Sequence, residues 1–207
     1  DLIVEFTPPG ASYDGQVHRP SVTVMDGGGR TIPASEYSVD YGATDWTGVG
    51  THTVTITNKT GGNYVIPEKS ADFEILVAGQ DPLSIVGQPG AVRYGDTFTL
   101  STSGGSGTGA VSWTSSDTTV AVIDQNGLVS VRTSGGPVTI TATKAAGGGF
   151  GAMTATWTFS AGKRSVTPMV TADDKVFDGT MNADLRTAWK DGDLLPDDTI
   201  DLTFLSG

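Results

Sequence analysis

The chain has 207 residues and a formal net charge of −11, from 12 basic and 23 acidic side chains. Nucleic acid is excluded as a partner, because binding to phosphates requires a basic surface that this composition does not provide. Only 37% of the residues are hydrophobic, and the chain contains 29 glycines and 10 prolines beside many Thr, Ser and Val. Since Gly and Pro break helices and β-branched residues suit strands, the composition predicts an all-β protein.

No apolar stretch approaches the roughly 20 residues of a membrane helix, so no membrane insertion is expected, and Asp1 does not open a signal peptide. The chain has no cysteine, which fits several compartments. We therefore expect either a cytosolic chain or a piece of a longer exported protein.

Alternating apolar and polar residues predict a first set of short strands. It comprises residues 2–6, 21–26, 37–42, 51–59 and 71–77, and AGQDP (78–82) is predicted to be a linker. Short strands with turn signals between them are typical of a small all-β module.

A second set of short strands follows the linker. It comprises residues 82–87, 96–103, 110–116, 120–124, 128–133, 137–144 and 155–162. The number and spacing of these strands predict an immunoglobulin-like sandwich without a disulfide. Between two apolar runs, QNG (125–127) predicts a hairpin, because Asn-Gly tolerates positive φ at both central positions of a tight turn.

The third set is short. It starts at residues 165–179 and ends with a strand at 199–205, which is too little for a stable domain, and ADLRTAW (183–189) allows one helical turn at most. Its VFDG (176–179) repeats the SYDG (12–15) of the first set, after a similar strand and bend. The sequence therefore predicts a further copy of the first module that is cut short.

The middle of the chain carries a specific resemblance. SWTSSDTTVAVIDQNGLVSV (112–131) and GGPVTITATKA (135–145) resemble the group 2 bacterial immunoglobulin-like domain. The matching positions are Trp113, Ser115, Ser116, Asp117, Val120, Ala121, Ile123, Asp124, Gly127, Val129, Gly136, Ile140, Thr141, Ala142 and Thr143. Independently, Trp113 suits a core, Asp117 an Asx turn and Gly127 a positive φ. These are structural roles, so the resemblance implies no catalytic residue.

The flanking segments resemble the Tyr-Asp-Gly-type β repeats of bacterial surface proteins. The first carries YDGQVHRPSVTV (13–24) and the last ADDKVFDGT (172–180), with Phe177 in the aromatic position. The resemblance implies tandem immunoglobulin-like β-sandwich modules, with a β-grasp-like sheet as the alternative for the flanking ones. The expected modules are residues 1–79, 80–162 and, as a truncated copy, 163–207.

No catalytic, cofactor-binding or metal site is predicted. His18 and His52 are the only histidines, and we expect a structural or solvent-facing role for them. The acidic residues after 172 lack the spacing of a calcium loop. If they are exposed, Trp46 and Trp189 are the candidates for ligand binding, since their rings could stack on a sugar; the competing interpretation is core packing.

The resemblance implies a non-catalytic repeat segment of a large bacterial cell-surface protein, acting outside the cell as a spacer or stalk and in adhesion. Short linkers, AGQDP and SAGKRS (160–165), are expected to limit bending between modules. The expected partners are neighbouring modules and a host or community glycan or protein, and the chain is expected to be a monomer. The alternative is a carbohydrate-binding accessory segment of a secreted glycan-degrading enzyme.

Overall fold

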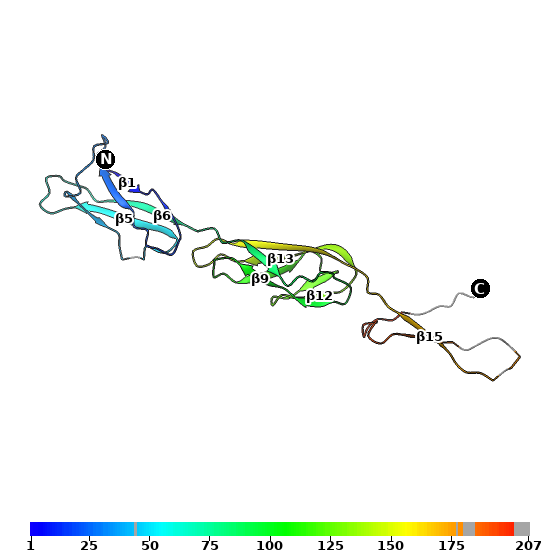
Figure 1. Cartoon of the computed structure of the whole chain (residues 1–207). Helices are drawn as coiled ribbons and strands as arrows, with labels where there is room; N and C mark the ends of the chain where they lie inside the picture. The colour runs from blue at the N-terminus through cyan, green and yellow to red at the C-terminus, as the bar shows by residue number, and fades with distance from the viewer. Residues whose placement is uncertain (44, 177, 180–184, 201–207) are drawn as a thin grey trace. The chain divides into compact units, whose positions relative to one another are not determined.

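The computed structural model describes residues 1–43, 45–176, 178–179 and 185–200. Every helix or strand assigned in these residues is a β-strand (Figure 1), which confirms the predicted all-β class. The strands form immunoglobulin-like β-sandwich modules. By packing, the chain divides into unit 1, residues 1–84, 103–112 and 143–155, and unit 2, residues 85–102, 113–142 and 156–207.

The N-terminal part of unit 1 contains two sheets. A four-stranded sheet has the order β2-β6-β5-β4, and a two-stranded sheet pairs β1 with β3. Of these strands only β2 was not predicted, because two residues are too few to show a sequence pattern. The strands are β1 (Ile3–Thr7), β2 (Ala11–Ser12), β3 (Ser21–Met25), β4 (Tyr37–Asp40), β5 (Gly50–Asn58) and β6 (Lys69–Leu76).

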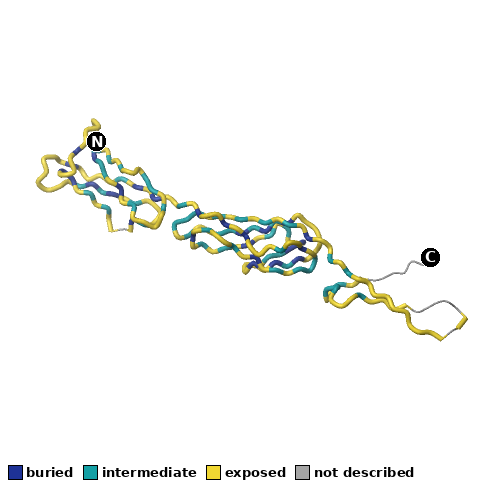
Figure 2. Tube along the Cα trace, viewed as in Figure 1, coloured by how far each residue is buried: buried dark blue, intermediate teal, exposed yellow. Residues whose placement is uncertain are grey.

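The core of this part follows from the alternation in β5. Val54 and Ile56 are fully buried, because successive side chains of a strand point to opposite faces. On the solvent face of the sheet, the Thr53 hydroxyl donates to the Asp72 carboxylate over 2.8 Å. Figure 2 shows this change between buried and exposed positions along β5 and β6.

The middle strands also form sheets, of order β10-β13-β14, β11-β12-β8 and β7-β9. Strands β7, β9, β10, β13 and β14 contribute residues to both units. The strands are β7 (Leu83–Val86), β8 (Thr97–Thr99), β9 (Ser101–Gly104), β10 (Val111–Ser115), β11 (Ala121–Ile123), β12 (Leu128–Val131), β13 (Gly135–Lys144) and β14 (Met153–Ala161).

Three residues of the middle segment have the roles that the sequence predicts. Trp113 is buried, with 6% of its surface exposed. The Asp117 carboxylate accepts the backbone N–H of Thr119 at 2.9 Å, as in an Asx turn. Gly127 has φ of +85°, and a Cβ there would overlap the carbonyl oxygen of Leu100.

The hairpin at QNG is confirmed, but its turn is not one in which both Asn and Gly have positive φ. Strands β11 and β12 pair in antiparallel register, yet no residue other than glycine has positive φ in the described chain, so Asn126 does not. The Gly127 N–H donates to the carbonyl of Asp124 at 3.1 Å, and the Asp124 N–H donates to the carbonyl of Leu128 at 3.0 Å. The loop therefore holds three residues with glycine in the left-handed position, a common alternative to the two-residue turn.

The last described strands are β15 (Pro168–Ala172) and β16 (Leu185–Trp189), which form a two-stranded antiparallel ribbon. None of the described residues from 162 to 200 is buried. The stretch 183–189, for which the sequence allowed a helical turn, contains β16 instead, because pairing with β15 outweighs its local preference. The strand predicted at 199–205 falls mostly on residues outside the described ones.

Candidate functional site

Trp46 lies in the core of unit 1. Only 1% of its surface is exposed, and its indole N–H donates to the carbonyl of Tyr41 at 2.9 Å. Its ring centre lies 5.4 Å from that of Tyr41, 4.8 Å from that of His52 and 5.9 Å from that of Phe73. Neither face of this ring is open, so the exposure that sugar stacking requires is missing at Trp46.

Trp189 is the last residue of β16, in unit 2, and is partly exposed. Its indole N–H donates to the carbonyl of Ile200 at 3.0 Å. The two tryptophans are thus placed in different units, one inside a core and one on the ribbon.

The two histidines make local hydrogen bonds, His18 from a loop and His52 from strand β5. The His18 Nε2 lies 2.7 Å from Oδ1 of Asp14, which also accepts the N–H of Gln16 at 2.8 Å. These bonds, with the Gln16 N–H contributing most, hold the pKa of Asp14 below its usual value. The His52 Nε2 lies 2.8 Å from the carbonyl of Gly48. Among the described residues, no group of three or more His, Cys, Asp or Glu side chains could hold a metal ion.

The predicted linker AGQDP is held by contacts within unit 1. The N–H of Ala78 donates to the carbonyl of Gly149, and the N–H of Gly151 donates to the carbonyl of Ala78, both over 2.9 Å. The side chain of Gln80 is buried; its amide N–H donates to the carbonyl of Gly151, and its amide oxygen accepts the N–H of Gly107 at 3.2 Å. Both backbone and side chain therefore fasten this segment.

The aromatic residue of the first Asp-Gly turn joins the same contacts. The rings of Tyr13 and Phe150 meet edge to face, with centres 5.4 Å apart. Gly149 has φ of +84°, and a Cβ there would overlap the ring of Tyr13. Only glycine fits under the ring, so Tyr13 packs directly on the backbone of the 147–150 loop.

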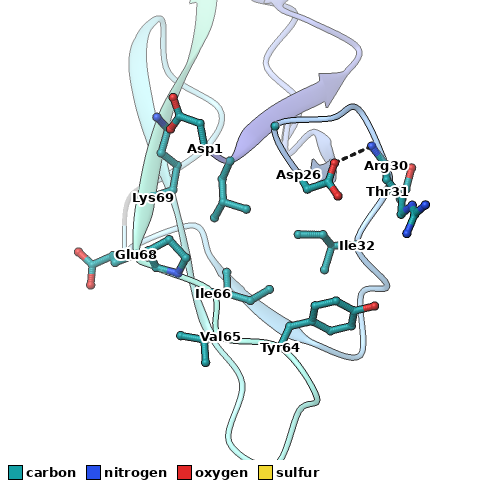
Figure 3. A pocket seen from close by; sticks show the side chains of 13 residues that line it. Asp1, Asp26, Arg30, Thr31, Ile32, Tyr64, Val65, Ile66, Glu68 and Lys69 are labelled. Carbon is teal, nitrogen blue, oxygen red and sulfur yellow. Dashed lines mark hydrogen bonds between the residues drawn. The ribbon is translucent and has the colours of Figure 1, made fainter.

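A cavity of about 510 Å³ opens between two other loops of unit 1 (Figure 3). One wall is the turn at residues 26–32. Its Asp26 carboxylate accepts the N–H groups of Arg30 and Gly28, each at 2.9 Å, and these bonds, that of Arg30 first, lower the pKa of Asp26. The Ile32 N–H donates to the carbonyl of Val24 at 2.8 Å. This wall is a closed hydrogen-bonded turn.

The other wall is the loop between β5 and β6, which is anchored on Glu36. This carboxylate is buried, with 6% of the residue exposed, and accepts both the backbone N–H and the side-chain amide of Asn63. A Cβ at Gly62 would lie 2.7 Å from its Oε2, so a larger residue there would displace the carboxylate. The Ile66 N–H donates to the Asn58 side chain at 3.0 Å, which fixes the far end of the loop.

The cavity combines an apolar floor with a charged rim. Ile32 and Ile66 are buried, and Tyr64 and Val65 lie beside them with 54% and 95% of their surfaces exposed. Figure 3 shows Ile32, Ile66 and Tyr64 around the same space, with the Val65 side chain on the other side of the loop backbone. Sequence reasoning missed the site, although the two Gly-rich loops MDGGGR (25–30) and TGGNYV (60–65) could have indicated it.

Comparisons with known proteins agree with the middle part of the fold. Residues 93–146 match the family described as "Intimin, immunoglobulin-like domain". The middle of the chain is thus a bacterial immunoglobulin-like domain. No curated protein sequence matches the chain.

Several solved structures are similar in part. An intimin mutant of EHEC O157:H7 is 26% identical over 47% of this chain and 49% of its own, with a TM-score of 0.29. A C-terminal intimin fragment, solved with the intimin-binding domain of the translocated intimin receptor, is 17% identical over 84% of this chain and 67% of its own, with a TM-score of 0.32. Surface layer protein SbsC, domains 1–6, is 17% identical over 83% of this chain and 28% of its own, with a TM-score of 0.35. The chain thus spans about half the length of the EHEC intimin mutant.

The described residues contain no helix that is long and apolar enough to cross a membrane.

Proposed function

We propose that this chain is a non-catalytic repeat segment of a large bacterial cell-surface protein, where it serves as a spacer or stalk and takes part in adhesion. The observation that carries the proposal is the match of residues 93–146 to the intimin immunoglobulin-like domain family, within an all-β chain. We assign residues 80–162 to the group 2 bacterial immunoglobulin-like type and residues 1–79 and 163–207 to the Tyr-Asp-Gly type, the last as a partial copy.

The mechanism of a spacer is mechanical. A stalk holds its tip away from the cell surface only if the segments that link its domains resist bending. Repetition of small domains makes the stalk longer. The hydrogen bonds of Ala78 and Gln80 and the packing of Tyr13 on Gly149 support this role, because they restrain the AGQDP segment within unit 1. The chain acts as a monomer outside the cell and needs no cofactor.

Surface location is tested with antibodies against the 207-residue chain on cells of the source organism. We expect labelling of intact cells, and loss of the label after brief protease treatment of those cells. Labelling that requires permeabilised cells contradicts the proposal.

The spacer role is tested by replacement. An in-frame deletion of the segment should reduce adhesion of the cells. A rigid, unrelated β-sandwich array of the same length should restore the part of adhesion that depends on reach alone. If neither change alters adhesion, the proposed function is wrong.

A further inference from the structure

The loop that follows β16 in unit 2 has one side packed against other segments of that unit. We call residues 190–198 the clasp loop. No described residue from 162 to 200 is fully buried, but four side chains of this loop are half-buried: Asp193, Leu194, Leu195 and Asp198. Half-buried side chains in a loop that belongs to no sheet require partners elsewhere, and these partners are found in the SAGKRS linker and in residues 92–95.

We infer that the clasp loop fastens the SAGKRS linker to residues 92–95 of the middle domain, and that these contacts set the stiffness of the junction. With the clasp closed the linker is held in one conformation, and with the clasp open it is a short flexible segment. This inference rests on the proposed spacer role, for which it names the residues that resist bending.

The linker first lies along the edge of the middle domain. The N–H of Gly162 donates to the carbonyl of Val92 at 2.9 Å, and the N–H of Tyr94 donates to the carbonyl of Gly162 at 3.0 Å. These bonds form a parallel bridge between Arg93 and Gly162. The start of the linker is therefore fixed to the 92–95 segment.

The clasp loop then binds the second half of the linker and the start of β15. The guanidinium of Arg164 donates to the carbonyl of Asp193 at 2.9 Å and to the carbonyl of Gly192 at 3.0 Å. The Asp193 carboxylate accepts the N–H of Thr167 at 2.7 Å, and the N–H of Lys190 donates to the carbonyl of Thr167 at 3.1 Å. Because the donors of a guanidinium lie in one rigid plane, Arg164 fixes the orientation of the loop as well as its distance.

The clasp loop also contacts the middle domain directly. The Tyr94 hydroxyl donates to the Asp198 carboxylate at 2.6 Å. This bond raises the pKa of Tyr94, so the hydroxyl keeps its proton and continues to donate. Beside it, a Cβ at Gly95 would lie 2.5 Å from a methyl carbon of Leu195, so the leucine side chain rests on the glycine backbone. One polar and one apolar contact therefore join the loop to the domain.

The three segments form a closed set of contacts, because each of them touches the other two. Neighbouring domains of one chain move relative to each other unless contacts prevent it. A linker fixed at one end rotates about that end, whereas a linker within a closed set rotates only after a contact breaks. Exposed hydrogen bonds contribute little singly, so the clasp opens at a lower free energy than the domain unfolds.

The experiment measures the distance between two spin labels in the 207-residue chain by double electron–electron resonance. The chain has no cysteine, so labels are attached only at Thr99→Cys in β8 and Thr171→Cys in β15, both at exposed positions. We expect one narrow distance distribution in the parent chain. Its width should increase about twofold or more in Arg164→Ala and in the double variant Y94F/L195A, since a released linker samples many conformations.

The matched control is Lys163→Ala, which removes an exposed cation of the same linker that forms no ion pair with the described residues. This variant should keep the width of the parent. The double variant leaves the donors of Arg164 and the pairing of β15 with β16 in place, and parent-like amide chemical shifts of these strands show that the broadening comes from the junction.

The inference is overturned if the parent distribution is already as wide as those of the two clasp variants. It is equally overturned if both variants stay as narrow as the parent, because the named contacts then do not set the stiffness. Surface labelling and the length-replacement experiment are made on cells and do not depend on the clasp. A failed clasp is therefore distinguishable from a failed spacer role.

Discussion

The two Asp-Gly turns have similar local backbones in very different surroundings. Gly15 has φ of +79° and Gly179 has φ of +84°. Beside the first turn, Tyr13 packs on Phe150 and on the backbone of Gly149. Around the second turn, no described residue from 162 to 200 is buried.

This difference separates a local property from a tertiary one. An Asp-Gly pair supplies a carboxylate acceptor and a residue that tolerates positive φ, which is enough for a turn. The packing of the partly buried Tyr13 depends on the 147–150 loop, far away in sequence. We call residues 1–161 the core region and strands β15 and β16 the ribbon, and the predictions below test the contrast between them.

The largest effect is expected for Trp46→Ala in the core region. Removing this buried side chain should lower the free energy of unfolding by about 3–5 kcal/mol, because it leaves a cavity among Tyr41, His52 and Phe73. Urea unfolding followed by circular dichroism measures the change. Trp189→Ala on the ribbon is the control, and a comparable loss there would remove the contrast.

The next effect concerns two glycines with the same φ of +84°. Gly149→Ala should cost about 2–4 kcal/mol, from the left-handed backbone and from overlap with Tyr13. Gly179→Ala meets no atom of the described residues within 4 Å, so only the backbone cost of about 1–2 kcal/mol is expected. Urea unfolding measures the first, and the Cα chemical shifts of the turn report the second.

A double-mutant cycle isolates the ring contact. In a Tyr13→Ala background, Gly149→Ala should cost less than in the parent, because the overlapping ring is gone. Equal costs in both backgrounds would show that the ring of Tyr13 does not rest on Gly149 in solution.

Hydrogen exchange compares the two regions without mutation. Amides of β5, on either side of buried Val54, should exchange slowly, near the rate set by global unfolding. Amides of β15 and β16 should exchange orders of magnitude faster, since an isolated two-stranded ribbon is marginally stable. Strong protection of the ribbon contradicts this view.

The smallest effect is a loss of stability in acid. Hydrogen bonds from the Thr119 hydroxyl, and then its N–H, lower the pKa of Asp117, and the Leu128 N–H does so for Asp124. Both folded-state pKa values lie below the unfolded value of about 3.9. The stability that the two ionised carboxylates contribute is therefore present above that pH and is lost as pH falls through the folded pKa. The thermal midpoint should therefore decline below about pH 4. The decline should be shallower in the D117N/D124N variant, which keeps the acceptor oxygens without titrating.

Much of the fold could be predicted from the sequence. The alternation in THTVTITNK places Val54 and Ile56 inside, and the turn at Asp117 depends only on neighbouring residues. The hairpin at Asp124–Leu128 was predicted, but its turn type was not, since the two-residue and three-residue loops share the same Asn-Gly signal. The candidate site was not predicted at all, because its walls come from loops separated by more than one strand.

The sequence by itself determined the strands, most of their turns and the class of the fold, because period-two alternation and turn residues act over a few positions. Only the tertiary structure decided that Trp46 is enclosed, that Tyr13 rests on Gly149, and that Glu36 holds the loop beside an open cavity. Each of these depends on which distant segments meet. A local sequence pattern does not show which distant segments pack together, since a buried and an exposed aromatic residue look alike in a loop sequence.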